Sequence, residues 1–214
     1  MHIDPFRHAG KKYKVFGYSI SEKEINDLFK AWIIISVAFA FILGTRSILS
    51  VEFMQNLVIS LVAVGTGFVF HELAHKAVAQ KYGCFAEFRA NMSMLWFALI
   101  IAYFAGIVFA APGAVMISGY VNKRINGKIS LAGPLTNMIL AVLFLGLSVY
   151  VSLEGLDFLA IVFGYGFMIN TWLGLFNLLP FGNFDGIKIL RWNKVYYGLI
   201  VAFGLVLLSV QMLA

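Results

Sequence analysis

His71, Glu72 and His75 are the residues of this 214-residue chain best suited to chemistry, and they lie within a long apolar segment. In an α-helix, residues four apart lie about 6 Å apart along the axis and about 40° apart around it. Both imidazoles can therefore reach one Zn²⁺ ion. Glu72 lies near enough to take a proton from water held by that ion. The spacing predicts a catalytic zinc site.

An alternative is that these side chains form a buried hydrogen-bonded cluster or lie on a water-exposed helix end. Ionisable groups inside membrane spans are costly and usually functional, which favours zinc. Two histidines leave a tetrahedral ion short of one protein ligand, so a catalytic site needs a third ligand and an open position for water. The other histidines, His2 and His8, lie in the N-terminal stretch.

Asp185 is the candidate for the third ligand. Pro180 and Gly186 flank it and loosen the helix, so its side chain is free to turn inward. Asp185 and His75 each lie a few residues before a lysine, so both approach the same membrane boundary. Taken alone, this segment also fits a span that simply ends in a turn.

The composition places these residues in a membrane. Hydrophobic residues make up 61% of the chain and charged residues 12%, which excludes a water-soluble globular protein. Apolar runs long enough to cross a hydrocarbon layer of about 30 Å predict spans near 31–49, 53–80, 129–152 and 158–180, and a fifth span towards the C-terminus. The net charge of +6 comes from basic residues that flank these runs, which fits membrane topology better than nucleic-acid binding. The single cysteine, Cys84, cannot form an intramolecular disulfide.

The basic residues also predict an orientation. Six of the 16 Lys and Arg precede the first span, which places the N-terminus of a multi-pass cell-membrane protein in the cytosol: Arg7, Lys11, Lys12, Lys14, Lys23 and Lys30. Residues 1–30 lack the apolar core of a signal peptide and are expected to form a cytosolic segment, with residues 31–214 as the membrane core. Within the segment, 15–20 alternates like a strand and 21–24 is typical of a capping box.

Residues 92–120 do not fit a simple span. The stretch is apolar but has basic residues on both sides, and its 29 residues are fewer than the about 40 that two helical crossings need. A re-entrant hairpin or membrane-embedded strands fit best, with 111–113 as the breaker. We therefore expect an all-α polytopic membrane protein with five to six transmembrane helices and this irregular element between spans two and three.

Three motifs, at 71–75, 132–137 and 177–186, resemble those of the site-2 protease family of intramembrane zinc metalloproteases. The first has the form H-E-x-x-H. The second matches G-P-x-x-N through Gly133, Pro134 and Asn137, and the third matches N-x-x-P-x-x-x-x-D-G through Asn177, Pro180, Asp185 and Gly186.

The resemblance implies that His71, His75 and Asp185 bind one Zn²⁺ and that Glu72 is the general base. Asn177 would position the substrate carbonyl or stabilise the oxyanion. Structural roles near the site fall to five residues: Gly133, Pro134, Asn137, Pro180 and Gly186. The implied reaction is hydrolysis of peptide bonds within or near transmembrane segments, as in regulated intramembrane proteolysis. The partners are then a transmembrane protein substrate and the lipid bilayer, with the substrate-binding residues and oligomeric state open.

Two other functions fit parts of the pattern. A membrane protease of the CAAX-processing type would use a glutamate as third ligand, but the acids besides Asp185 that follow span two suit this poorly: Glu87, Glu154 and Asp157. A metal-binding transporter or scaffold would also use intramembrane His and Asp. Such a protein has no need of the glutamate between the histidines.

Overall fold

The computed structural model describes residues 11–15, 17–44, 46–108 and 113–213. Within this part of the chain, five helical stretches are long and apolar enough to cross a membrane. They are α1 (Glu22–Leu43), the continuous α2 (Val51–Ser60), π-helical turn (Leu61–Gly65) and α3 (Thr66–Lys81), then α5 (Lys123–Leu153), α6 (Asp157–Asn177) and α8 (Lys194–Leu213). The chain is thus a multi-pass membrane protein, as its composition predicts.

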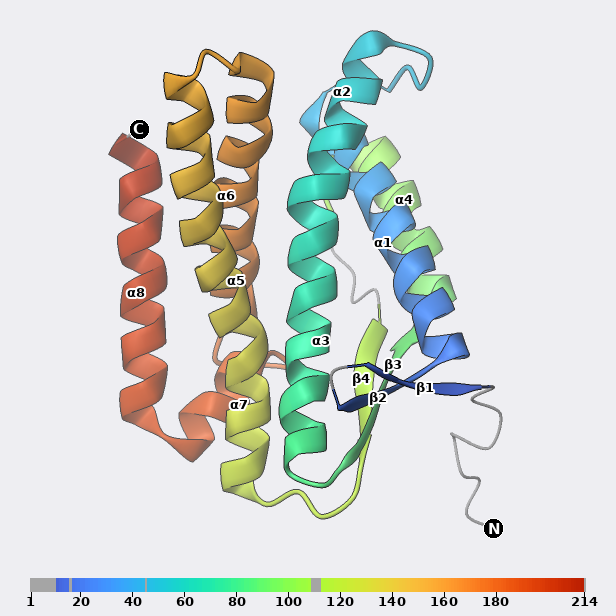
Figure 1. The fold of residues 1–214 in the computed structure, drawn as a ribbon, viewed down its shortest axis with the longest axis vertical. Coiled ribbons are helices and arrows are strands. Elements are labelled where there is room, and N and C mark those ends of the chain that lie inside the picture. The colour runs from blue at the N-terminus through green and yellow to red at the C-terminus, as the bar shows by residue number, and fades with distance from the viewer. Residues whose placement is uncertain (1–10, 16, 45, 109–112, 214) are drawn as a thin grey trace.

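The helices form two groups that meet where α3 packs against α5 (Figure 1). One group holds α1, α3, the short α4 (Met92–Ala105) and two small sheets, around a core that includes Leu28, Val64 and Phe88. The other holds α5, α6, α8 and the short α7 (Asp185–Trp192), around a core that includes Met138 and Ile189. Any side chains that α3 and α7 share must therefore meet beside α5.

Within the N-terminal segment, β1 (Lys12–Val15) and β2 (Tyr18–Ser21) pair as a hairpin. The prediction of one strand over 15–20 is wrong. The chain turns at Gly17, whose φ of +84° is a conformation that glycine adopts without strain. Ser21 then caps α1 by accepting a hydrogen bond from the backbone of Glu24, so this half of the predicted capping box is confirmed.

The Glu24 carboxylate does not complete the capping box. It pairs instead with Lys76 on α3 and accepts a hydrogen bond at 3.0 Å from the backbone N–H of Phe88. Both charged side chains are buried, with relative exposures of 0% for Glu24 and 3% for Lys76. Removing one partner would leave the other as an uncompensated buried charge. This one carboxylate therefore holds the start of α1, helix α3 and a strand of the second sheet together.

The second sheet pairs β3 (Phe85–Ala90) antiparallel with β4 (Gly113–Ser118), and α4 lies between them in the chain. Because Phe85 lies opposite Ser118, residues 85–118 begin and end at the same end of the molecule. Near the other end, Arg46 donates to the carbonyl of Phe104 on α4. Strands rise about 3.3 Å per residue against 1.5 Å in a helix, so the excursion needs fewer residues than two helical crossings. Residues 111 and 112 of the expected breaker lie outside the described residues, and the depth of this segment in a membrane stays a prediction.

One edge of this sheet is closed by side chains. Three outward backbone groups of β3 are paired with side chains: the Ala86 carbonyl accepts from the Gln80 amide, the Phe88 N–H donates to Glu24, and the Ala90 N–H donates to Asp27. Strand β4 therefore forms the other edge, and only that edge is free to pair with a further strand.

Charge at the two ends of the bundle gives a test of orientation. The first turn of α5 carries Lys123 and Arg124, whereas at its other end Glu154 follows α5 and Asp157 begins α6. In a Cys84→Ser background, we expect a cysteine at Arg124 to resist an impermeant thiol reagent in intact cells because basic loops stay in the cytosol. A cysteine at Glu154 should react. Both should react after the membrane is permeabilised, and the reverse pattern in intact cells would contradict the predicted topology.

Candidate metal centre

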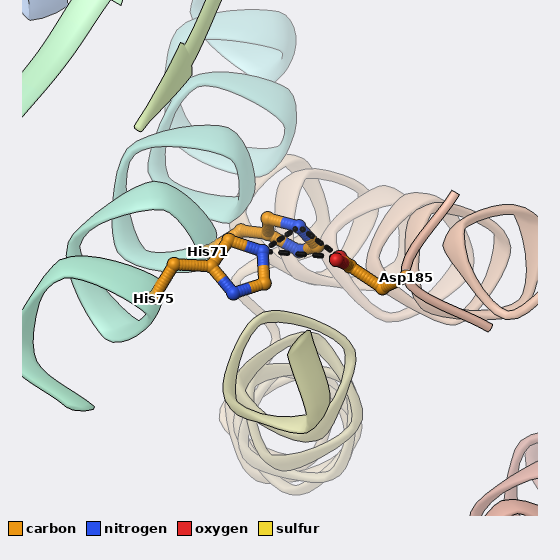
Figure 2. Close-up of side chains that lie close together, drawn as sticks. All are labelled: His71, His75 and Asp185. Carbon is orange, nitrogen blue, oxygen red and sulfur yellow. Dashed lines mark hydrogen bonds and ion pairs between the residues drawn. The ribbon is translucent and has the colours of Figure 1, made fainter. Parts of the chain in front are cut away.

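Three side chains from two elements converge beside α5 (Figure 2): His71 and His75 of α3 and Asp185 at the start of α7. The two imidazole Nε2 atoms lie 3.0 Å apart. The Asp185 Oδ2 atom lies 3.0 Å from Nε2 of His75 and 3.5 Å from Nε2 of His71. All three side chains are buried, and among the described residues they form the one group of three or more potential ligands.

The outer nitrogen of each imidazole shows which atom carries the proton. His75 Nδ1 lies 2.7 Å from the carbonyl oxygen of Ile129, which only accepts, so Nδ1 must donate. His71 Nδ1 lies 2.5 Å from Oδ1 of Asn137, whose Nδ2 in turn donates to the carbonyl of Gly67 at 3.2 Å. Both histidines thus carry their proton on Nδ1. Two Nε2 lone pairs and a carboxylate oxygen face one another, an arrangement that a cation satisfies.

The spacing of these atoms fits zinc. In a tetrahedral site with bonds of about 2.0–2.1 Å, neighbouring ligand atoms lie about 3.3–3.4 Å apart, close to the separations in this cluster. The backbone of α5 also makes room beside the cluster. A Cβ added to Gly133 would lie 2.5 Å from Nε2 of both His71 and His75. Any larger residue at this position would occupy the space beside the ligand atoms.

Asp185 reaches the cluster because the chain leaves α6 abruptly. After Asn177 the chain bends through Pro180, and α7 begins at Asp185. A Cβ on Gly186 would lie 2.0 Å from the Leu178 carbonyl oxygen, so only glycine lets α7 start this close to the end of α6. The turn brings the Asp185 carboxyl group within 3.0–3.5 Å of Nε2 of the two histidines.

Glu72 lies between this cluster and the edge of the second sheet. Because Ala86, Phe88 and Ala90 direct their backbone groups outward, so do their partners on β4, which are Gly113, Val115 and Ile117. The Val115 N–H faces the Glu72 carboxyl. Apart from this contact, no hydrogen bond to the outer edge of β4 is found among the described residues. The open edge therefore runs beside the candidate base.

Of the other residues singled out in the sequence, some lie at the cluster and some lie away from it. Asn137 is buried against His71, and Pro134 is buried beside Gly133 in α5. The Asn177 side chain donates at 2.9 Å to the Leu173 carbonyl in its own helix, and it makes no described hydrogen bond to the histidines or Asp185. Of the rival acids, Glu87 pairs with Arg89 on β3, and Glu154 and Asp157 lie at the opposite end of α5 and α6.

Sequence reasoning missed Asn170. It lies in the apolar core of α6, is fully buried, and its Oδ1 accepts from Asn137 at 3.0 Å. An amide in the middle of a transmembrane helix is itself a signal, because polar groups there need partners. The carbonyls of Ile129 and Gly67 carry no such signal, because every residue has one.

Known proteins resemble this chain in sequence. It is 42% identical over 184 residues to the "Putative zinc metalloprotease MJ0611" of Methanocaldococcus jannaschii, a match that covers 86% of this chain and 91% of the relative. It is 33% identical over 153 residues to the "Putative zinc metalloprotease YwhC" of Bacillus subtilis, with 64% and 68% covered. The chain belongs to this family of zinc metalloproteases. Zn²⁺ is its cofactor, in agreement with the donor set of the cluster.

A third relative of this zinc metalloprotease is more distant in sequence. The "Zinc metalloprotease MJ0392" of Methanocaldococcus jannaschii is 28% identical over 162 residues, which cover 73% of this chain and 41% of that relative. No family model matches the chain. No solved structure matches it either.

Asp185→Asn should strongly reduce zinc binding, because two histidines alone leave the ion short of a protein ligand. The loss of affinity should exceed the roughly 10–100-fold that removal of an outer partner costs. Asp157→Asn, at the exposed start of α6, is the matched control and should bind zinc normally. Metal analysis of the purified variants after dialysis measures the difference. Equal zinc contents would mean that the third ligand lies elsewhere.

Gly133→Ala should expel zinc by placing a methyl group against both ligating nitrogens. Gly146→Ala in the same helix is its control, because an added Cβ there meets nothing within 4 Å. Alanine favours a helix over glycine by about 1 kcal/mol, so neither change should disrupt α5 by itself. Competition with a chelator gives the zinc affinity of each variant. Wild-type affinity in Gly133→Ala would show that zinc does not sit beside this face of α5.

Proposed function

We propose that this zinc metalloprotease is an intramembrane protease of the site-2 type, which hydrolyses peptide bonds within or near transmembrane segments of membrane proteins. The observation that supports this most directly is the position of the cluster. His71, His75 and Asp185 lie in the interior of a bundle of membrane-length helices. A substrate that reaches this site has to come from the membrane or its boundary.

The residues divide the chemistry between them. A zinc ion held by His71, His75 and Asp185 supplies Lewis acidity, which lowers the pKa of water to about 7 and polarises a carbonyl. Glu72 follows His71 directly and accepts the proton of the attacking water, then returns it to the leaving amine. Asn137 and the Ile129 carbonyl keep the imidazole protons on Nδ1, so that both Nε2 atoms stay available. The assignment of Asn177 to the substrate carbonyl requires its side chain to leave the Leu173 carbonyl.

The open edge of β4 supports a mode of substrate binding. A helical substrate hides its carbonyls in hydrogen bonds and must unwind before it is cut. An extended segment could pair with the outward backbone groups of β4, as peptides do when they add a strand to a sheet. It would then pass beside Glu72, which faces the Val115 N–H. The closed edge of β3 leaves β4 as the place for this pairing.

The location proposed is the cell membrane, with the N-terminus and the metal centre towards the cytosol.

A transporter or passive metal scaffold is the other candidate function. A protein that only binds or transports metal does not need a general base. Glu72 lies next to the candidate ligands but is not one of them, which favours an enzyme.

Glu72→Gln should abolish proteolysis and leave zinc bound, because the amide keeps the shape of the side chain but does not accept the proton. The loss should reach or exceed the 10²–10⁴-fold typical of one acid–base group. Purified protein in detergent micelles would be incubated with a panel of single-span membrane proteins, with products identified by mass spectrometry. Glu154→Gln, in an exposed loop, is the control. A panel cut by zinc-loaded wild type and by Glu72→Gln alike would refute the mechanism.

Ile117→Pro tests the substrate edge. Its N–H points away from β3, so proline there removes a donor from the open edge and keeps the pairing with β3. We expect KM for a cleaved transmembrane substrate to rise severalfold, with zinc content unchanged. Met116→Ala, which removes an exposed side chain and no backbone donor, should leave KM unaltered. An unchanged KM in Ile117→Pro would argue against strand pairing.

A further inference from the structure

Asn170 uses all of its hydrogen-bonding groups within the bundle. Its Nδ2 donates to the carbonyls of Ala63 at 3.2 Å and Gly166 at 3.0 Å, and its Oδ1 accepts from Asn137. The side chain is fully buried in α6. None of the three sequence motifs contains it.

These contacts determine how two amides are oriented. Backbone carbonyls only accept, so the carbonyls of Ala63 and Gly166 require Nδ2 of Asn170 to face them. Oδ1 of Asn170 must then face Asn137 and accept from it. That contact, together with the Gly67 carbonyl, uses both N–H groups of Asn137. Asn137 is left with Oδ1 towards Nδ1 of His71, at 2.5 Å.

The chain of contacts also follows one face of the helix that carries the ligands. Gly67 and His71 lie four residues apart on one face of α3, and Ala63 lies in the π-helical turn that precedes them. Asn170 donates to the Ala63 carbonyl, and Asn137 donates to the Gly67 carbonyl and accepts from Nδ1 of His71. Asn137 also donates to Asn170, which links the two side chains. A Cβ on Gly67 would lie 2.6 Å from Oδ1 of Asn170, so this position leaves no room for a side chain.

We infer that Asn170 is a positioning residue for the zinc site, which acts through Asn137 to keep the proton of His71 on Nδ1 and its Nε2 directed at the metal. This inference rests on the zinc site proposed above. It concerns metal binding alone, so a chain that binds zinc but cuts no peptide would contradict the proposed function and not this role.

The test compares Asn170→Leu with Thr171→Val. Thr171 is the neighbouring residue, is equally buried, and donates only within its own helix to the Phe167 carbonyl. Asn170→Leu should weaken zinc binding by roughly 10–100-fold, the usual effect of losing an outer partner of a metal ligand. Thr171→Val should keep wild-type affinity. Affinity would be measured by chelator competition with the full-length protein in detergent.

Two further measurements separate positioning from packing. If Asn170 acts through Asn137, the double variant Asn137→Leu/Asn170→Leu should bind zinc no more weakly than Asn137→Leu alone. The visible absorption of the Co²⁺-substituted protein reports ligand geometry, and it should change in Asn170→Leu but not in Thr171→Val. Additive losses, or an unchanged Co²⁺ spectrum with wild-type zinc affinity, would overturn the inference.

Gly67→Ala provides a second route that does not depend on how well Asn170→Leu folds. The added methyl group displaces the Asn170 oxygen, while alanine itself favours the helix. It should weaken zinc binding and alter the Co²⁺ spectrum as Asn170→Leu does. Wild-type zinc affinity and spectrum in Gly67→Ala would overturn the inference.

Discussion

The structure depends on three atoms that attract cations and repel one another. Nε2 of His71, Nε2 of His75 and a carboxylate oxygen of Asp185 meet in a buried space, with the imidazole protons held on the far side of each ring. Without a positive charge between them, this arrangement is costly in a medium of low dielectric. A metal ion held by these three atoms would couple its binding to the docking of α7 against α3, because neither element alone supplies all three atoms.

Helix α5 and the second sheet flank α3 and shape the surroundings of the cluster in different ways. Helix α5 approaches closely enough to line the site because position 133 is glycine, and it also supplies the Ile129 carbonyl and the Asn137 amide. The second sheet lies on the other side of α3, where the buried Glu24–Lys76 pair fixes it to the helix. Closure of the β3 edge then leaves the β4 edge facing Glu72. The ligand cluster, the candidate base Glu72 and the open edge of β4 therefore all lie on α3 or directly beside it.

The sequence predicts the features that local spacing controls and misses those that depend on distant pairing. His71 and His75 could be placed together because a helix fixes their separation, and Asp185 could be proposed because few other acids lie near a span end. The spans follow from apolar length. By contrast, Glu24 has the residue type and position of a capping box, yet its carboxylate binds Lys76, 52 residues away. The pairing of strand 85–90 with strand 113–118 could not be predicted from the sequence either, because it also joins segments that lie far apart in the chain.

The π-helical turn at 61–65 has a consequence for how this span tolerates changes in length. Side chains donate hydrogen bonds to four successive backbone carbonyls at this turn, those of residues 60 to 63. A π-helical turn holds one residue more than the α-helical turn it replaces. Deleting one residue there would restore a regular α-helical turn and leave the rotation of α2 relative to α3 nearly unchanged, whereas the same deletion within α3 would rotate the flanking helical segments by about 100° relative to one another. The π-helical turn is therefore a place where this span can change its length by one residue while the histidines keep facing Asp185, although none of the residues at 61–65 belongs to the metal cluster.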